Sequence, residues 1–435
     1  MEQIYHVRKW TPHNPIKITV PGSKSITNRA LMLAAMSNCA CTLEGVLFSD
    51  DSRAFLSCLQ SLGFDINIDE EKRKVLLQGT GGKIPKQNAC INVRSAGTAA
   101  RFLTVLLAFA GGDYEMRSSA QMAKRPMQPL LSILENAGAR IEYLCEEGHF
   151  PFILHAHNLK FTNIEIDTSL SSQFASALLM AGCLLPDGLS LTMTGSRTSG
   201  SYIKMTLAVM EQFGIRFTEK ESASGKKTYA IEGGRSFGIT NFLIEPDLSG
   251  AAYFYSLAPL FGIDVLVRDV HLNSLQGDIK YVKLLATLGC RLQDTDEGLW
   301  LKGSGITHFS GQTVDMKDFS DQTMTFAAVS IFADTVTEIV NIGHIRFQET
   351  DRLNAILNEL SRMGIQCEEI PEQEGIRIYP GTCKPALIHT YEDHRMAMAF
   401  TLAGMKSGGI DIENPACCAK TFENYFELID SLYVT

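Results

Sequence analysis

The sequence predicts an α/β fold of two similar domains, each made of three repeated β/α units of about 75 residues. Three observations lead to this fold class: a helix that ends in glycine recurs at a nearly constant spacing, an alanine-rich helix precedes it each time, and short strand-like runs lie between the helices. The 435-residue chain also exceeds the ~250 to 300 residues that one hydrophobic core usually serves, so two domains are expected.

The first observation is a helix, a glycine and a short alternating strand that occur together five times. Glycine suits the left-handed backbone conformation that ends many helices. Successive glycines are 75, 76, 75 and 75 residues apart, a regularity that chance does not give. The five segments are Phe55–Ile66 around Gly63, Leu130–Tyr143 around Gly138, Thr206–Thr218 around Gly214, Tyr281–Leu292 around Gly289 and Leu353–Glu368 around Gly364.

The second observation is an alanine-rich helix at the same phase of each repeat, which brings the number of units to six. Short runs with strand composition separate the helices, so each unit is predicted to be a β/α module with two helices. The alanine-rich helices are expected at Asn28–Met36, Thr98–Ala110, Gln173–Leu184, Ser249–Phe261, Gln322–Ala333 and His394–Met405, and three of the strands at Ile91–Val93, Ile164–Ile166 and Thr337–Val340.

The sixth unit has its last helix at Phe422–Leu432, but the chain stops before the glycine and strand that would follow. A sheet edge is normally covered, and the N-terminal segment Gln3–Val7 alternates like a strand, so we assign it to that place. Residues 19–243 are therefore expected to form one domain, and residues 1–18 with 244–435 the other. The expected hinges are the two proline-containing crossings, Thr11–Pro21 and Ile244–Ser249.

Composition and charge exclude several classes of protein. No apolar run reaches the ~18 residues of a membrane span, and the start of the chain has no secretory leader, so a cytoplasmic protein is expected. The formal net charge is -9, which argues against nucleic acid as a partner because that affinity needs clustered positive charge. The eleven cysteines include no Cys-x-x-Cys pair, so no metal site is predicted.

Polar and basic residues gather where the alanine-rich helices begin. A helix N-terminus has free N–H groups and a partial positive charge, which stabilise an anion by typically ~0.3 to 1 kcal/mol. Ordinary N-capping explains any one of these segments, but five of them at one phase of the repeat favour a multiply charged anionic ligand. The segments are Pro21–Arg29, Arg94–Arg101, Ser169–Gln173, Asp318–Thr323 and Tyr391–Arg395.

Further basic residues lie in loops, at Arg125, Arg352 and Lys420. Asp321 and Glu349 stand in the same half of the chain as the last two. A carboxylate pair near cations suits acid/base catalysis, and structural ion pairs give the same sequence pattern, so both interpretations stay open at this point.

Five motifs are the most specific part of the sequence: Pro21–Arg29, Ser171–Gln173, Glu349–Leu353, Asp393–Met398 and Ala419–Phe422. In order and spacing they resemble the 5-enolpyruvylshikimate-3-phosphate (EPSP) synthase family, and the resemblance covers essentially the whole chain. It implies two three-unit domains with the active site in the interdomain cleft.

The resemblance also implies an activity, that of a transferase of the shikimate pathway, which leads to chorismate and the aromatic amino acids. The enolpyruvyl group of phosphoenolpyruvate would move to the 5-hydroxyl of shikimate 3-phosphate, with release of phosphate. No cofactor and no metal are implied. We expect a monomer whose partners are these two small-molecule substrates, with no nucleic acid and no membrane.

Site residues follow from the resemblance position by position. Asp321 resembles the base that takes the 5-hydroxyl proton, Glu349 resembles the acid that protonates the methylene carbon of phosphoenolpyruvate, and Lys24 is the third catalytic residue and would contact both substrates. The contacts implied for shikimate 3-phosphate are Lys24, Ser25, Arg29, Ser171, Ser172, Gln173, Ser199, Tyr202, Asp321, His344 and Gln348. The contacts implied for phosphoenolpyruvate are Lys24, Gly97, Arg125, Gln173, Arg352, Arg395 and Lys420.

The sequence departs from the family pattern at several positions. His344 and Gln348 stand where the family usually has Asn and Lys for shikimate 3-phosphate, which is the most consequential departure. Ser95 stands in place of an Asn, Phe102 in place of a Pro, and Gly200-Ser201 in place of a Lys-Pro pair.

Two other functions compete with this interpretation. The sister enzyme that transfers enolpyruvyl to UDP-N-acetylglucosamine shares the fold, but it commonly has a Cys in the loop of the second unit, and Gly111–Arg125 contains none. A catalytically silent homologue that only binds anions would gain nothing from Asp321 and Glu349 among its cations.

Overall fold

The computed structural model describes residues 3–12, 15–161, 163–169, 171–195, 200–222 and 225–434, and the predicted α/β fold class is confirmed. The chain divides into two compact units, Gly22–Ile244 and Met1–Pro21 with Glu245–Thr435. They are called the central unit and the terminal unit below. Their limits lie one and three residues beyond the domain ends expected at 243 and 18.

Each repeat is a small sheet with two helices, as one copy in the central unit illustrates. Strand β6 (Asn88–Asn92) runs parallel to β7 (Gly112–Arg117), and α3 (Gly97–Ala110) connects them. Helix α5 (Gln128–Asn136) leads to a hairpin of β8 (Arg140–Tyr143) and β9 (Phe152–Ala156), in which β9 pairs antiparallel with β7. The resulting strand order is β6-β7-β9-β8.

The same order recurs in the other four-stranded sheets of the described chain. In the central unit they are β14-β3-β5-β4 and β10-β11-β13-β12, with β3 (Ala40–Glu44), β4 (Ile66–Asp69), β5 (Lys74–Gln78), β10 (Asn163–Asp167), β11 (Leu189–Thr194), β12 (Phe217–Glu221), β13 (Lys227–Ile231) and β14 (Asn241–Leu243). In the terminal unit they are β16-β17-β15-β2 and β18-β19-β21-β20, with β2 (Ile16–Ile18), β15 (Asp264–Arg268), β16 (Arg291–Thr295), β17 (Gly298–Lys302), β18 (Thr313–Asp315), β19 (Thr337–Val340), β20 (Cys367–Ile370) and β21 (Gly375–Ile378).

The two chain crossings exchange strands between the sequence halves. Strand β2 comes from the N-terminal segment and pairs parallel with β15, whereas β14 comes from the end of the central segment and pairs parallel with β3. Strand β1 (Ile4–His6) pairs antiparallel with β23 (Ile410–Glu413), which runs parallel to β22 (Ala386–Ile388). The N-terminal segment therefore covers the edge of the sixth sheet, where it was expected.

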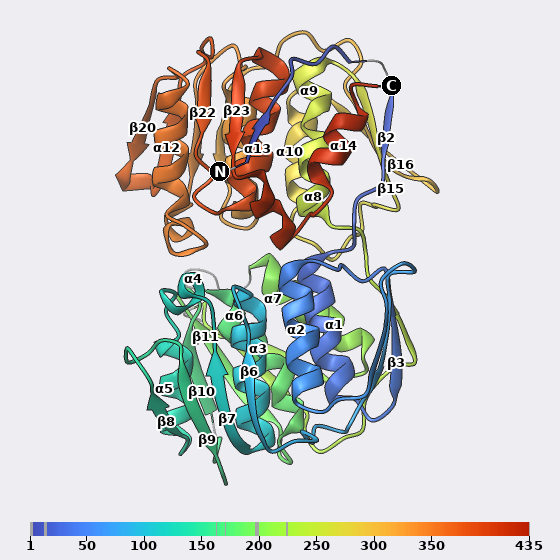
Figure 1. Ribbon diagram of the computed structural model, residues 1–435, viewed down its shortest axis with the longest axis vertical. Coiled ribbons are helices and arrows are strands. Elements are labelled where there is room, and N and C mark those ends of the chain that lie inside the picture. The colour runs from blue at the N-terminus through green and yellow to red at the C-terminus, as the bar shows by residue number, and fades with distance from the viewer. Residues whose placement is uncertain are drawn as a thin grey trace. The chain divides into compact units, whose positions relative to one another are not determined.

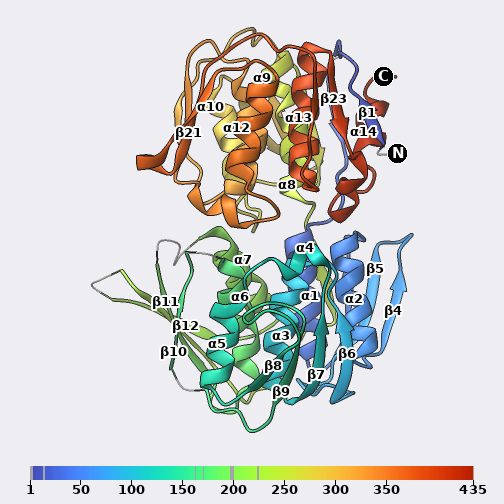
Figure 2. The same cartoon turned by 60° about the vertical axis from the view of Figure 1, so that its left-hand side comes forward.

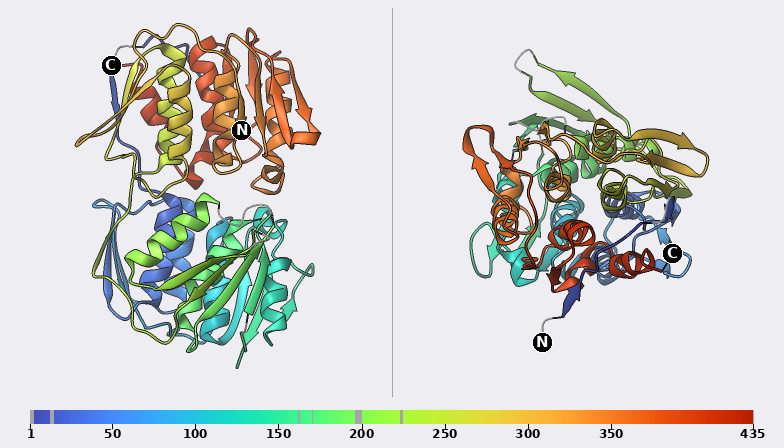
Figure 3. Two further views of the ribbon diagram at one scale, coloured as in Figure 1. Left: turned by 180° about the vertical axis from the view of Figure 1, so that it is seen from behind. Right: turned by 90° about the horizontal axis from the view of Figure 1, so that it is seen from above.

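The alanine-rich helices form the interior of each unit, and the sheets lie outside them (Figures 1, 2 and 3). They are buried on all sides, as in α11, where all eight residues are buried, because each packs against its neighbouring inner helices and a sheet. The inner helices are α1 (Lys24–Met36), α3, α6 (Ser172–Ala181), α8 (Leu248–Tyr255) with α9 (Leu257–Phe261), α11 (Thr323–Ser330) and α13 (His394–Ser407).

The outer helices are amphipathic, and the repeating glycines end five of them as predicted. Gly63, Gly138, Gly214, Gly289 and Gly364 all have positive φ, between 75° and 106°. At the first, the N–H of Gly63 donates to the Gln60 carbonyl at 3.0 Å and the N–H of Phe64 to the Leu59 carbonyl at 3.1 Å, a Schellman pattern. The outer helices are α2 (Asp50–Ser61), α5, α7 (Ser201–Gln212), α10 (Ile279–Thr287), α12 (Arg352–Arg362) and α14 (Tyr425–Ser431).

Within the described ranges, no helix is both long enough and apolar enough to cross a membrane.

Gly214 allows the backbone requirement to be tested without a change in packing. Its φ is 84°, and an added Cβ would meet no other described atom within 4 Å. Gly214→Ala should lower the free energy of unfolding by about 1 kcal/mol through left-handed strain alone, and Gly214→Asn by less, because Asn tolerates that conformation. Urea denaturation followed by circular dichroism measures both variants. Equal losses of stability for Ala and Asn would contradict left-handed strain as the reason that glycine recurs at this position.

Candidate active site

One buried arginine organises the predicted site residues of the terminal unit. Arg352 is the first residue of α12, and its side chain is 1% exposed. Its Nη1 lies 3.1 Å from Asp321 Oδ1, and its Nη2 lies 2.9 Å from Glu349 Oε2. The two carboxylates that were predicted as base and acid are therefore held by the same guanidinium group.

Asp393 binds the Nε side of this guanidinium group. It is fully buried, and its carboxylate accepts from Arg352 Nε at 2.7 Å and from Arg352 Nη2 at 3.2 Å, a two-pronged contact. Asp393 is also the N-cap of α13 and accepts from the Arg395 N–H. Burial lowers the pKa of Arg352, but the charges of Asp393, Glu349 and Asp321 outweigh burial and raise it. Arg352 is therefore a permanent cation.

Two further cations complete the cluster. Arg395 Nη2 lies 2.8 Å from Asp321 Oδ2, and Lys420 Nζ lies 3.7 Å from Glu349 Oε1. Asp321 and Glu349 thus each lie beside two cations. The Lys420 Nζ is buried and has no hydrogen-bond partner among the described residues. A buried ammonium with unused donors suits an anionic ligand.

The two positions that depart from the family pattern lie beside this cluster. His344, in the 3-10 turn Gly343–Phe347, has its Nε2 2.7 Å from the hydroxyl of Ser320, the residue before Asp321. The Gln348 side-chain oxygen accepts a hydrogen bond from Arg352 Nη1. His344 thus contacts the residue that precedes the predicted base, and Gln348 contacts the arginine that binds both the predicted base and the predicted acid. Their contacts with shikimate 3-phosphate stay a prediction.

Lys24 and Ser25 begin α1 in the central unit. Ser23 caps this helix by accepting from the Ile26 N–H, so the first residues of α1 follow directly after the cap. Lys24 Nζ lies 3.4 Å from Asp51 Oδ2, and the Asp51 side chain is 5% exposed. This acidic partner of Lys24 was not predicted, although Asp50 and Asp51 at the start of α2 are a visible signal.

Gly97 and Arg125 form a second basic position in the central unit. Gly97 is the first residue of α3, and a Cβ there would lie only 2.7 Å from Arg125 Nη1. The absence of a side chain lets the guanidinium group reach the N-terminus of this helix. A cation beside free N–H groups is a suitable place for a phosphate or carboxylate group.

Arg29, a predicted contact of shikimate 3-phosphate, is buried among protein groups. It is 2% exposed, and its guanidinium group donates to Thr206, Ser176 and the carbonyl groups of Ser25 and Tyr202. Burial lowers its pKa to about 10, and Tyr202 acts in the opposite direction. The Phe102 ring centre lies 5.5 Å from the guanidinium carbon. Arg29 therefore joins α1, α6 and α7.

The remaining predicted contacts follow the same placement at helix starts. Ser171 is the N-cap of α6 and accepts from the Gln173 N–H at 3.2 Å, while Ser172 is its first residue. The buried Gln173 Oε1 has no hydrogen-bond partner in the described chain. Tyr202 is the second residue of α7. Ser199 lies outside the described residues.

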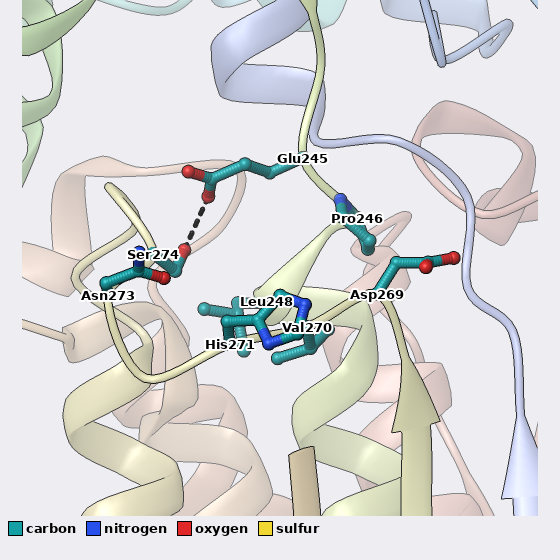
Figure 4. Close-up of a pocket in the computed structure, with 8 residues that line it drawn as sticks. All are labelled: Glu245, Pro246, Leu248, Asp269, Val270, His271, Asn273 and Ser274. Atoms are coloured by element: carbon teal, nitrogen blue, oxygen red, sulfur yellow. Dashed lines mark hydrogen bonds between the residues drawn. The ribbon is translucent and has the colours of Figure 1, made fainter. Parts of the chain in front are cut away.

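A small hollow in the terminal unit contains none of the predicted site residues (Figure 4). Its wall includes Glu245, whose carboxylate accepts from the Ser274 hydroxyl at 2.5 Å and from the Leu275 N–H at 3.1 Å. The residues that line it are Glu245, Pro246, Leu248, Asp269, Val270, His271, Asn273 and Ser274.

Known proteins are similar to this chain over nearly its whole length. Residues 15–429 match the family of EPSP synthase (3-phosphoshikimate 1-carboxyvinyltransferase). The chain belongs to the EPSP synthase family. Among relatives of this EPSP synthase family member, the 3-phosphoshikimate 1-carboxyvinyltransferase of Nostoc punctiforme is 38% identical, over 95% of this chain and 96% of that protein. The 3-phosphoshikimate 1-carboxyvinyltransferase 2 of Halalkalibacterium halodurans is 34% identical, over 97% and 96%.

A solved structure supports the fold of the family member separately. The EPSP synthase of Acinetobacter baumannii matches with a TM-score of 0.80 at 24% identity, and the match covers 100% of this chain and 99% of the other.

Arg352 and Arg346 offer a matched pair for testing the buried cluster. Arg346 also contacts two carboxylates, those of Asp351 and Glu369, but its side chain is 25% exposed. Arg352→Lys should lower the free energy of unfolding by about 3 kcal/mol, because lysine cannot reproduce the contacts of the buried guanidinium group with three carboxylates, one of them fully buried. Arg346→Lys should cost less than about 1 kcal/mol. Similar losses in urea denaturation would contradict the central place of Arg352.

Proposed function

We propose that this EPSP synthase family member uses Asp321 as the base and Glu349 as the acid to move the enolpyruvyl group of phosphoenolpyruvate to the 5-hydroxyl of shikimate 3-phosphate. One observation supports this assignment most strongly: Arg352 contacts both carboxylates, with Arg395 and Lys420 beside them. A site that only bound anions would be weakened by two carboxylates among its cations.

The proposed chemistry is an addition followed by an elimination. Asp321 takes the proton of the 5-hydroxyl while the 5-hydroxyl oxygen of shikimate 3-phosphate bonds to C2 of phosphoenolpyruvate, and Glu349 supplies a proton to C3. The result is a tetrahedral intermediate. The bond from C2 to the phosphate oxygen then breaks, the Glu349 carboxylate takes a proton back from C3, and Asp321 returns its proton to the phosphate that leaves. Asp321 and Glu349 thus each gain and lose a proton during turnover. Arg352 stays positively charged throughout and stabilises whichever of them is ionised.

We assign phosphoenolpyruvate to the cations that lie at helix starts and in the cluster. Charge-assisted hydrogen bonds to phosphate and carboxylate are roughly twice as strong as neutral ones, so this trianion suits a strongly basic environment. Gly97 contributes its backbone N–H group, and Gln173 contributes an amide side chain. The cations are Lys24, Arg125, Arg352, Arg395 and Lys420.

We assign shikimate 3-phosphate to Lys24, Ser25, Ser171, Ser172, Gln173, Ser199, Tyr202, Asp321, His344 and Gln348. Arg29 belongs with this set in a supporting role. Its guanidinium donors bind the carbonyl groups of Ser25 and Tyr202, so it fixes two of the proposed contacts. We also propose a cytoplasmic monomer without a cofactor.

A phosphate-release assay tests the substrate assignment. Purified protein should release phosphate from phosphoenolpyruvate only when shikimate 3-phosphate is present. UDP-N-acetylglucosamine should not replace it. Release that depends on the nucleotide sugar would overturn the proposal in favour of the sister enzyme, and no release with either acceptor would favour a silent homologue.

The catalytic roles can be tested with isosteric variants. Asp321→Asn and Glu349→Gln should each lower kcat by at least about 100-fold, because the amides cannot exchange the required protons. The matched control is Asp318→Asn, three residues before Asp321, whose carboxylate pairs with Lys280 at the surface. This control should keep near-normal activity. Full activity in either test variant would refute its assigned role.

A further inference from the structure

A carboxylate that the proposed reaction does not use is buried next to Asp321. Asp278 directly precedes α10 and is 6% exposed. Its Oδ2 accepts from the Ser249 hydroxyl at 2.7 Å, and its Oδ1 accepts from Gln322 Nε2 at 3.2 Å. No lysine or arginine in the described chain forms an ion pair with it. A buried carboxylate that lacks a paired cation is costly and calls for an explanation.

The loop that carries Asp278 is held in place from the second chain crossing. Gln276 donates to the Glu245 carboxylate at 3.1 Å and to the Pro246 carbonyl at 2.8 Å, and it accepts from the Leu248 N–H at 3.0 Å. Figure 4 shows Glu245 reaching Ser274 in the same loop. These hydrogen bonds fix the position of the loop, and with it the position of Asp278.

Asp278 in turn fixes the backbone that carries Asp321. Gln322, which binds Asp278, is the next residue after Asp321 and is fully buried. Its Oε1 accepts from Thr325 at 3.0 Å, and Ser320 on the other side of Asp321 contacts His344. Asp321 thus lies in a 3-10 turn, Ser320–Gln322, whose two flanking side chains are both engaged.

The charge of Asp278 acts on Asp321 as well. The pKa of Asp278 is raised overall: burial and the charge of Asp321 raise it, and they outweigh Arg395 and the hydrogen bonds from Ser249 and Gln322, which lower it. Lys280, two residues further along α10, is paired with Asp318 instead. Repulsion between two carboxylates is mutual, so Asp278 also disfavours ionised Asp321. Arg352 and Arg395 have the opposite effect, because each contacts Asp321 directly.

We propose that Asp278 is a positioning residue for the transfer reaction. It fixes the turn that carries Asp321, and its negative charge offsets the stabilising effect of Arg352 and Arg395 on ionised Asp321, so that Asp321 stays basic enough to accept the substrate proton. This inference rests on the proposed role of Asp321. It gives the buried carboxylate a function in the reaction without any contact with substrate.

Asp278→Asn removes the charge and keeps the shape of the side chain; its amide oxygen can still accept from Gln322 Nε2, while its NH2 group can donate to the Ser249 hydroxyl. We expect kcat to fall about threefold and the acidic limb of the kcat/KM profile to move to lower pH by about half a unit, because ionised Asp321 loses a like-charged neighbour. KM for both substrates should change less than about twofold. Asp264→Asn is the control, since Asp264 is also largely buried but lies on β15 and binds Ser304 and Lys302. It should leave the limb in place.

An unchanged kcat and an unchanged limb in Asp278→Asn would overturn the proposal. A fall in kcat with a lower thermal midpoint and no movement of the limb would show a purely structural role and would overturn it too. Carbon-13 NMR titration of the Asp321 carboxyl, assigned with Asp321→Asn, gives a readout without turnover. Its midpoint should be lower in Asp278→Asn than in the wild type, and equal midpoints would refute the inference even if the wild type proved inactive as a transferase.

Discussion

The burial of the Arg352 guanidinium is the constraint on which the terminal unit depends. A buried cation is tolerated only when carboxylates and hydrogen bonds compensate it. Here the compensation comes from three separate segments: the turn that carries Asp321, the loop before α12 that carries Glu349, and the cap of α13 at Asp393. These segments must meet at one point for the fold to form, so the interactions that stabilise the fold also bring together the proposed base and acid.

The repeat explains how residues far apart in the sequence reach such a point. Each inner helix follows a strand, and the inner helices of a unit pack side by side, so their starts lie at the same end. Lys24, Gly97 and Ser172 occupy these starts in the central unit, and His394 and Arg395 occupy one in the terminal unit. Residues that begin and cap the inner helices therefore place charged groups and hydrogen-bond donors together at one end of each unit.

Much of this arrangement could be predicted from the sequence because it depends on local patterns. The glycines at helix ends, the alanine-rich inner helices and the polar residues at their starts all have a periodicity or a cap that neighbouring residues reveal. The expected domain limits already assign residues 16–18 and 241–243 to the units that contain β2 and β14. Which sheet each strand joins could not be predicted, because strands of three residues carry too little pattern.

The partners of individual charges were also beyond prediction. Nothing near Arg29 in the sequence indicates that its donors bind Thr206 and Ser176, and for Lys24 the adjacent acids Asp50 and Asp51 do not show which of the two is its partner. The buried Asp278 is another such case, since its partners Ser249 and Gln322 are 29 and 44 residues away. Contacts between distant segments depend on how helices pack, and one sequence contains no record of that geometry.

The central claim is that one guanidinium group holds both the base and the acid of the reaction. Chemical rescue of Arg352→Ala tests it most directly, because the substitution opens a buried space the size of the missing group. Added guanidinium ions should restore phosphate release from phosphoenolpyruvate and shikimate 3-phosphate, whereas methylammonium, which has the charge but not the fork of donors, should restore little. Equal rescue by the two cations, or no rescue by guanidinium in a folded variant, would contradict the claim.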